Sequence, residues 1–210
     1  RVREGVTVIA TGPLTNLAVA LRQAPDIAHR IREISIMGGS VTLGNSTPVA
    51  EFNVWFDPEA ADIVFRSGVP LWMCGLNLTW QAGLDCAAVD RLEGLNTETA
   101  RAMAAVLRVY LGNLREGFGA SSASLHDPCA VAILLEPSVI TWVPMHVAVE
   151  LRGEHTRGMT ACDARHVRTF NPAAIEGGPP RGAPPNAHVA VALDHAGFIR
   201  LIEDALAACP

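Results

Sequence analysis

Short apolar runs alternate with helix-like segments over the first 76 residues, and this alternation limits the possible fold more than any other feature. Val6–Ala10 is a short run rich in β-branched residues, which predicts a strand. Over Leu14–Leu21 the apolar residues recur at helical spacing. Pro13 suits the first turn of that helix, and Pro25 ends it. The chain is therefore expected to open with a strand followed by a helix.

The same pair of elements then occurs again. Ile34–Met37 predicts a second buried strand, and Asp57 followed by Pro58 marks the start of a helix that ends at Gly68. Val69–Leu76 predicts a third strand. The βαβαβ order, with right-handed crossovers, predicts an α/β fold with an open, mostly parallel (Rossmann-like) sheet flanked by helices.

The second half of the chain adds further elements and one loop. Three helices are expected at Thr97–Phe118, Asp127–Leu135 and Phe198–Ala208. Three strands are expected near Val143–Leu151, Met159–Val167 and His188–Leu193. The Gly- and Pro-rich stretch Asn171–Pro185 predicts a surface loop rather than a domain linker, because too little chain follows it to form a separate core. A length of 210 residues favours a single domain over residues 1–210.

Charge and hydropathy exclude several classes of partner. The net charge of −5 and the pI near 5.8 argue against nucleic acid or an anionic membrane. No apolar run approaches the roughly 20 residues that span a bilayer. The N-terminal sequence RVREGVTVIA has no signal-peptide pattern, so we expect a cytoplasmic protein. The five cysteines include no CxxC pair, which predicts reduced thiols rather than a disulfide or zinc framework.

Glycines follow two of the predicted strands, in Ala10–Gly12 and in Met37–Gly39. In open α/β sheets, ligands bind beyond the carboxyl ends of the strands. Glycine is common in any tight βα turn, so each signal is weak alone. The polar loop Asn45–Asn53 follows the second strand, however, and the combination indicates a ligand site at this edge of the sheet.

That loop carries three side chains suited to hydroxyl groups, which are Asn45, Glu51 and Asn53. In an extended segment Glu51 and Asn53 face the same way, and Phe52 faces the other. A carboxylate accepts hydrogen bonds from hydroxyls, and a carboxamide both donates and accepts, which suits the vicinal diol of a sugar or polyol. The alternatives are a solvated loop with an incidental acid and, for Asn45 after Gly44, an ordinary turn.

A second candidate pair, His126 and Asp127, precedes an apolar helix. The carboxylate of Asp127 can ligate a hard cation, and the imidazole of His126 can carry a proton, as a catalytic pair would. Asp127 also precedes Pro128 in the way that Asp57 precedes Pro58, so a plain helix N-cap is the alternative for Asp127. For His126 the alternative is a purely structural histidine.

Five blocks of sequence carry a resemblance to a known family. They are ATGPLTNLA (10–18), IMGG (36–39), GNSTPVAEFNVWFDPEAA (44–61), CGLNLTWQA (74–82) and LHDPCAVA (125–132). In order and spacing they resemble the nucleoside hydrolase family, the inosine- and uridine-preferring N-ribohydrolases. The third block is long and specific, and the resemblance covers nearly the whole chain, strongly to about Leu135. It implies the nucleoside hydrolase fold.

The resemblance also implies a sugar site. By comparison with the family, Asn45, Glu51 and Asn53 hold the ribose hydroxyls. Met37 and Phe52 line the sugar pocket. The substrate implied is therefore a nucleoside.

The remaining roles implied by the resemblance concern metal and base. The backbone carbonyl of Thr11 and the carboxylate of Asp127 correspond to ligands of a tightly held Ca²⁺. His126 corresponds to a residue near the leaving base and is a candidate general acid. Tyr110 and Phe118 lie on a segment that reaches over the nucleobase in this family.

Two departures from the family pattern affect these expectations. Asn77 and Trp80 stand where the family usually has GLD-TH. The DxDxxxDD cluster that begins these enzymes, and supplies further Ca²⁺ ligands and the water-activating carboxylate, does not occur in this sequence. We therefore expect the C-terminal portion of a longer enzyme, with Val6–Ala10 as an unpaired apolar edge strand. As an isolated chain it is expected to bind Ca²⁺ weakly and to be inactive.

The resulting hypothesis is a Ca²⁺-dependent hydrolase that converts ribonucleosides to ribose and free base, acting as a homo-oligomer. The alternative is a nucleoside- or ribose-binding module that keeps Asn45, Glu51 and Asn53 but has lost catalysis. Neither the base preference nor the oligomeric state follows from the sequence.

Overall fold

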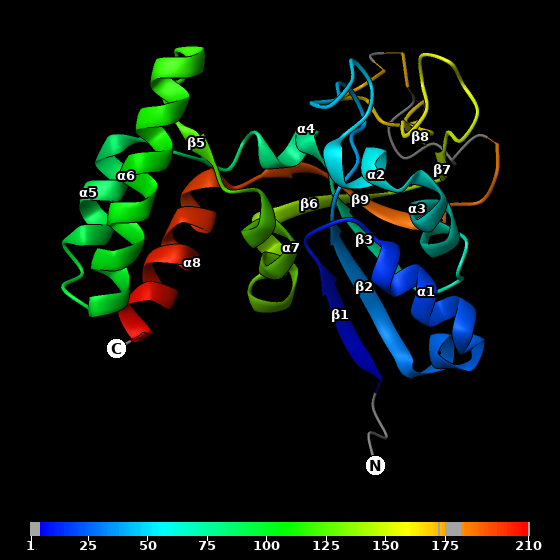
Figure 1. The fold of residues 1–210 in the computed structure, drawn as a ribbon, viewed down its shortest axis with the longest axis horizontal. Helices are drawn as coiled ribbons and strands as arrows, with labels where there is room; N and C mark the ends of the chain where they lie inside the picture. Colours follow the sequence, from blue (N-terminus) through cyan, green and yellow to red (C-terminus); the bar gives the residue numbers. More distant parts are fainter. Residues whose placement is uncertain (1–4, 172, 175–181, 210) are drawn as a thin grey trace. The chain divides into compact units, whose positions relative to one another are not determined.

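The computed structural model describes residues 5–171, 173–174 and 182–209. Their contacts divide the chain into two compact units, which are described separately. The first unit comprises residues 1–78 and 141–191, and the second comprises residues 79–140 and 192–210. Figure 1 labels most of the helices and strands of both.

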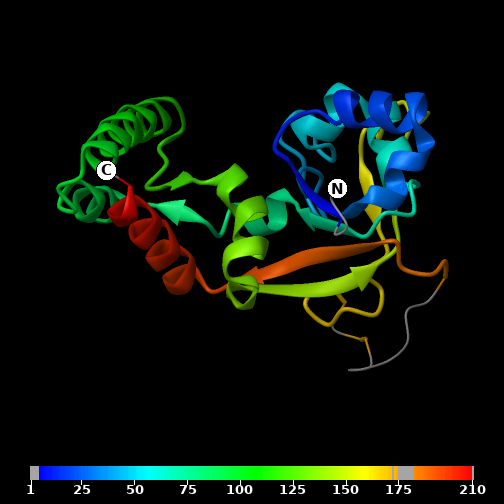
Figure 2. The ribbon, with the colours of Figure 1, turned by 90° about the horizontal axis from the view of Figure 1, so that it is seen from below.

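A five-stranded sheet forms the centre of the first unit, in the order β1-β2-β3-β9-β6. Its strands are β1 (Val6–Ala10), β2 (Ile31–Met37), β3 (Leu71–Cys74), β6 (Ile140–Met145) and β9 (Ala187–Leu193). The pairs β1–β2, β2–β3 and β3–β9 are parallel, which confirms the predicted sheet type. Figure 2 shows β9 beside β6. Because Ala10 pairs with Ile36 and Met37 pairs with Cys74, the carboxyl ends of β1, β2 and β3 lie at one edge.

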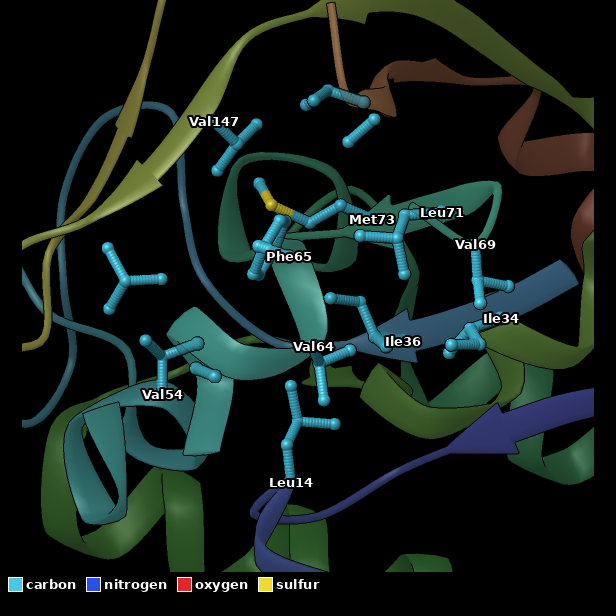
Figure 3. Close-up of a cluster of buried hydrophobic side chains, with 14 of the residues drawn as sticks. Leu14, Ile34, Ile36, Val54, Val64, Phe65, Val69, Leu71, Met73 and Val147 are labelled. Carbon is cyan, nitrogen blue, oxygen red and sulfur yellow. The ribbon is translucent and has the colours of Figure 1, made fainter. Parts of the chain in front are cut away.

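Helices cover one face of this sheet. They are α1 (Thr15–Gln23) and α3 (Pro58–Phe65), which pack against each other, with the 3-10 turn η1 (Pro25–Arg30) and the short α2 (Phe52–Phe56) beside them. Figure 3 shows the apolar side chains between helices and sheet, all of them buried. They include Leu14, Val64 and Phe65 from the helical side and Ile34, Ile36, Leu71 and Met73 from the strands. This core fixes the strand ends that carry the candidate site.

A two-stranded antiparallel hairpin, β7 (Val147–Val149) with β8 (Thr160–Cys162), also belongs to the first unit. The hydroxyl of Thr160 accepts a hydrogen bond from the Ser40 amide at 2.8 Å and donates to the Ser40 carbonyl at 2.7 Å. Since Ser40 follows β2 closely, this pair of hydrogen bonds fixes the start of the loop that leads to the candidate sugar site.

The second unit is mainly helical. Its elements are the end of α4 (Leu76–Thr79), β4 (Gly83–Leu84), α5 (Cys86–Glu93), α6 (Glu98–Phe118), β5 (Ala123–Ser124), α7 (His126–Leu135), the 3-10 turn η2 (Pro137–Val139) and α8 (His195–Ala208). The helices α5, α6 and α8 contact one another (Figure 1), and β4 pairs with β5 in antiparallel fashion. The predicted helix starting at Thr97 is confirmed, with the Thr97 hydroxyl as the N-cap acceptor.

Three sequence predictions of extended chain are corrected by the structure. The strand expected over Val143–Leu151 is two strands, since β6 ends at Met145 in the large sheet and β7 begins at Val147 in the hairpin. The strand expected over Met159–Val167 stops at Cys162, where the Ala164 amide turns back onto the Cys162 carbonyl. The third strand is shorter than expected because Leu76 already begins α4.

Other expectations concern residues and properties outside these strands. The surface loop expected over Asn171–Pro185 lies largely outside the described residues. The single domain expected over residues 1–210 stays a prediction. Among the helices that the structure describes, none is both long enough and apolar enough to cross a membrane. The five cysteines are free.

Candidate functional site

The carboxylate of Glu51 is buried at the edge of the sheet, with 2% of the residue exposed. Its Oε2 accepts hydrogen bonds from the amides of Gly39 (2.9 Å) and Val54 (3.2 Å), and its Oε1 accepts from Asn53 (2.9 Å). Glu51 is therefore the N-cap of α2. The extended geometry predicted for Glu51 and Asn53 is wrong, because the helix begins at Phe52. The alternative of a solvated loop acid is wrong as well.

Asn53 lies one residue inside α2 and is 8% exposed. Its Nδ2 donates to the backbone carbonyl of Met37 at 2.9 Å and approaches the Met37 sulfur at 3.4 Å. Met37 is the last residue of β2 and is buried. The side-chain carboxamide of Asn53 thus connects α2 directly to the carboxyl end of β2. Its Oδ1 is the atom suited to accept a hydrogen bond from a ligand hydroxyl.

Asn45 and Phe52 are joined at the rim of the same region. The Oδ1 of Asn45 accepts a hydrogen bond from the Phe52 amide at 2.9 Å. The amides of Asn45, Ser46 and Thr47 all donate to the carbonyl of Ala50, so the turn considered as an alternative for Asn45 is present. Both Asn45 and Phe52 are exposed. Asn45 therefore combines a turn position with a side chain that supports the first residue of α2.

The structure brings five sequence-predicted residues of the first unit together. Hydrogen bonds connect Glu51 to the turn after β2, Asn53 to Met37, and Asn45 to Phe52. This arrangement places a carboxylate and two carboxamides beyond the carboxyl ends of parallel strands, where open α/β sheets bind ligands. Such a group can hold the hydroxyls of a sugar. Most acceptor positions of the Glu51 carboxylate are taken by backbone N–H groups, so Glu51 also holds the backbone of the site in place.

Thr11 is exposed and directly follows β1 in the first unit. A side chain added at Gly12 would meet no atom within 4 Å, so the turn after β1 is open. Its backbone carbonyl is the group that the resemblance assigns to a metal ion.

In the second unit, His126 and Asp127 occupy the first turn of α7. Burial lowers the pKa of His126, and the neighbouring Asp127 carboxylate opposes that effect. Burial raises the pKa of Asp127, with His126 opposing it. Leu125 holds the N-cap position of α7, so the alternative in which Asp127 is the helix N-cap is wrong. Asp57, by contrast, caps α3 by accepting the Ala60 amide at 3.0 Å.

A hydroxyl that sequence reasoning missed contacts His126. The Oγ1 of Thr79 lies 2.8 Å from the Nδ1 of His126, and Thr79 is fully buried. Thr79 is one polar residue in the apolar run around α4, and its partner is 47 positions away. The resemblance block CGLNLTWQA contains it, which was the available signal.

The residues expected to hold calcium lie in separate units, Thr11 in the first and Asp127 in the second. Within the described residues, no group of three or more His, Cys, Asp or Glu side chains is placed to hold a metal ion.

Four further residues singled out in the sequence have clear positions. Tyr110 and Phe118 lie on α6 and are 39% and 84% exposed. Asn77 is structural in the first unit, since its Oδ1 accepts from the Val41 amide and its Nδ2 donates to the Ala190 carbonyl. Trp80 is exposed in the second unit.

Comparison with known proteins gives a consistent result. The family model described as inosine-uridine preferring nucleoside hydrolase matches residues 1–200. The pyrimidine-specific ribonucleoside hydrolase RihA of Enterobacter sp. (strain 638) is 40% identical over 205 residues, covering 97% of this chain and 61% of the relative. RihA of Shewanella woodyi is 41% identical over 202 residues, covering 96% and 61%.

Solved structures agree. The purine-preferring ribonucleoside hydrolase from Gardnerella vaginalis matches with a TM-score of 0.80 and 32% identity, over 96% of this chain and 60% of that one. The plant nucleoside hydrolase PpNRh1 matches with a TM-score of 0.81 and 31% identity, over 96% and 62%. The chain thus spans about 61% of the length of the curated relatives that it matches.

Proposed function

The chain belongs to the inosine-uridine preferring nucleoside hydrolase family, and from that premise we propose that its protein hydrolyses the N-glycosidic bond of ribonucleosides to give ribose and free base. The observation that best supports this proposal is the hydrogen-bonded group of Asn45, Glu51 and Asn53 at the carboxyl end of β2. Because the chain spans only part of its relatives, the activity is proposed for the whole protein.

In the proposed reaction the first-unit residues act on the sugar. Cleavage of a glycosidic bond passes through a transition state that resembles an oxocarbenium ion, with positive charge on the ring. The buried carboxylate of Glu51 and the Oδ1 of Asn53 accept hydrogen bonds from ribose hydroxyls. These contacts accelerate the reaction to the extent that they tighten as the ring flattens. Met37 and Phe52 supply the apolar surface beside the sugar.

The leaving base needs a proton or an equivalent hydrogen bond, and we assign this role to His126. Its Nδ1 is already engaged by Thr79, so Nε2 is the nitrogen available to a ligand. Imidazole is the side chain best suited to proton transfer near neutral pH.

Calcium dependence is the second part of the proposal. Backbone carbonyl and carboxylate oxygens, such as those of Thr11 and Asp127, are the ligands that Ca²⁺ prefers. We expect a chelator to abolish ribose release and added Ca²⁺ to restore it. Restoration by Mg²⁺ in place of Ca²⁺ would show that the metal is assigned wrongly.

Substrate and assembly are the least constrained parts. The curated relatives are named pyrimidine-specific, so uridine and cytidine are the first substrates to compare with inosine. We also propose that the protein is a homo-oligomer. Light scattering of the purified protein tests this by measuring its molar mass in solution.

The deciding experiment measures ribose release by the protein made from the complete reading frame that encodes this chain, with the 210-residue chain in parallel. Asp127→Ala is the test variant, and Asp85→Ala, which alters a helix cap in the same unit, is its matched control. We expect release by the complete protein, loss in Asp127→Ala, activity in Asp85→Ala, and no turnover by the 210 residues alone. Nucleoside binding without release would favour the binding module, and neither binding nor release would refute both.

A further inference from the structure

We propose that Thr79 is a positioning residue for His126, and that its hydroxyl fixes the imidazole through Nδ1 so that Nε2 faces the leaving base. The contact that carries this inference is the 2.8 Å approach of Thr79 Oγ1 to His126 Nδ1. The inference deepens the proposed function, and its catalytic half rests on that function. Its structural half is testable without any activity.

The burial of Thr79 decides which way the hydrogen bond runs in the neutral ring. Thr79 is 0% exposed, so its hydroxyl has no access to bulk water. Within the part of the chain that the structure describes, that hydroxyl forms a hydrogen bond with the Nδ1 of His126. A buried hydroxyl left without an acceptor is costly, so the Thr79 hydroxyl donates to Nδ1. The neutral imidazole then carries its proton on Nε2.

Backbone hydrogen bonds hold the two segments in place, so the contact does not depend on two side chains alone. The Ala82 amide donates to the Thr79 carbonyl at 3.1 Å, and the Leu125 amide donates to the Ala82 carbonyl at 2.9 Å. The antiparallel pair β4–β5, with Gly83 opposite Ser124, continues the same connection. The turn after α4 is thereby fixed to the residue that precedes His126.

A hydroxyl suits this position because it can donate to Nδ1 while the ring is neutral. In the proposed step, the Nε2–H of the neutral ring donates a hydrogen bond to a nitrogen of the base, and the electron pair of the broken C–N bond stays with the base. The ring keeps its proton on Nε2 and its contact with Thr79, so its orientation is retained throughout the step.

The structural test is the tautomer of His126, read from ¹⁵N chemical shifts of labelled imidazole nitrogens in the complete protein with its histidines neutral. A His126→Gln variant identifies the signals. We expect the Nε2–H tautomer in the parent chain and in Thr79→Ser. We expect a mixture of tautomers in Thr79→Val, which keeps the shape but lacks the hydroxyl. Unchanged His126 signals in Thr79→Val would overturn the inference, as would the Nδ1–H tautomer in the parent chain.

The kinetic test uses the complete protein and two ribosides. With a nucleoside, Thr79→Val should lower kcat at least tenfold with KM within about twofold, and Thr79→Ser should recover most of the loss. With p-nitrophenyl riboside, whose leaving group departs without a proton, Thr79→Val should retain its kcat. An equal loss with both substrates would show a general structural effect and contradict the inference. If the parent protein hydrolyses neither riboside, the proposed function fails, while the tautomer measurement still tests the Thr79 contact.

Discussion

The carboxylate of Glu51 caps helix α2 and, through the same oxygen atom, accepts the backbone N–H of Gly39 at 2.9 Å. One buried side chain thus connects the turn after β2 to the helix that carries Phe52 and Asn53. Glu51 is the residue to which the proposed function assigns a ribose contact. Substitution at this position is therefore expected to lower the stability of the folded protein as well as to weaken ligand binding.

Glu51→Gln tests the structural part of this relationship. A glutamine offers one acceptor oxygen, and its NH₂ group then faces a backbone N–H that the carboxylate had satisfied. Leaving a buried donor without an acceptor costs about 1–3 kcal/mol. We expect the free energy of unfolding, measured by urea denaturation, to fall by about that amount. Glu59→Gln is the matched control, since Glu59 forms an exposed pair with Arg157 and its loss should cost under about 1 kcal/mol. Equal costs in the two variants would contradict the structural role of Glu51.

Gly39 is a second residue of the site region where the backbone conformation limits which side chain can be present. Its φ is +71°, and a Cβ there would lie 2.8 Å from Thr160 Cγ2. Gly68 has a φ of +77° with open space around it. Gly68→Ala should cost about 1 kcal/mol for the left-handed conformation alone. Gly39→Ala adds overpacking against Thr160 and should cost about 2–4 kcal/mol. Unfolding curves that show the same loss for both variants would mean that Thr160 moves aside freely.

The sequence was most informative where the signal that decides an element is local. The strand β1 was predicted with its observed bounds, and α6 was predicted from Thr97, which is its N-cap. For β1 the signal is a short apolar run bounded by turn residues. For α6 it is the helical period of apolar residues, repeated over many turns. For both, the residues that decide the structure lie within the element itself.

Contacts between distant residues explain what the sequence did not reveal. Residue types identified Asn45, Glu51 and Asn53 as polar groups in one loop, but α2 has five residues, which is too few to show a helical period. The contact of Thr79 with His126 spans 47 positions, and no local pattern encodes it. The roles assigned to the site residues came from the resemblance and stay predictions.

The five cysteines give a prediction about reactivity. Cys86 and Cys209 are exposed, and Cys74 is buried. Burial raises the pKa of Cys129 and of Cys162 to about 12. Because only the thiolate reacts, each of these two thiols is on the order of 10⁻⁴ ionised at pH 8, and this fraction rises about tenfold per pH unit below the pKa.

We therefore expect N-ethylmaleimide at pH 8 to label Cys86 and Cys209 within minutes, and the other three at least a hundredfold more slowly. Mass spectrometry of peptides from the labelled chain identifies the sites. In denaturant all five should react at similar rates, which controls for intrinsic reactivity. Fast labelling of Cys129 in the native chain would show that its surroundings open readily.

Asp127 gives the sharpest separation of structural from functional roles, because its sequence pattern is that of a helix N-cap. Asp85 in the same unit is such a cap, accepting the Ala88 amide at 2.8 Å. Asp127 lies inside the first turn of α7, and burial raises its pKa, which means that the charged form is disfavoured there.

Asp85→Ala should lower the free energy of unfolding by about 1 kcal/mol, as removal of a cap does. Asp127→Ala should change it by less than about 0.5 kcal/mol, because the favourable helix dipole and the unfavourable burial oppose each other. If Asp127→Ala proves as destabilising as Asp85→Ala, a loss of activity in that variant could be explained by folding, and the proposed metal-binding role would lose its support.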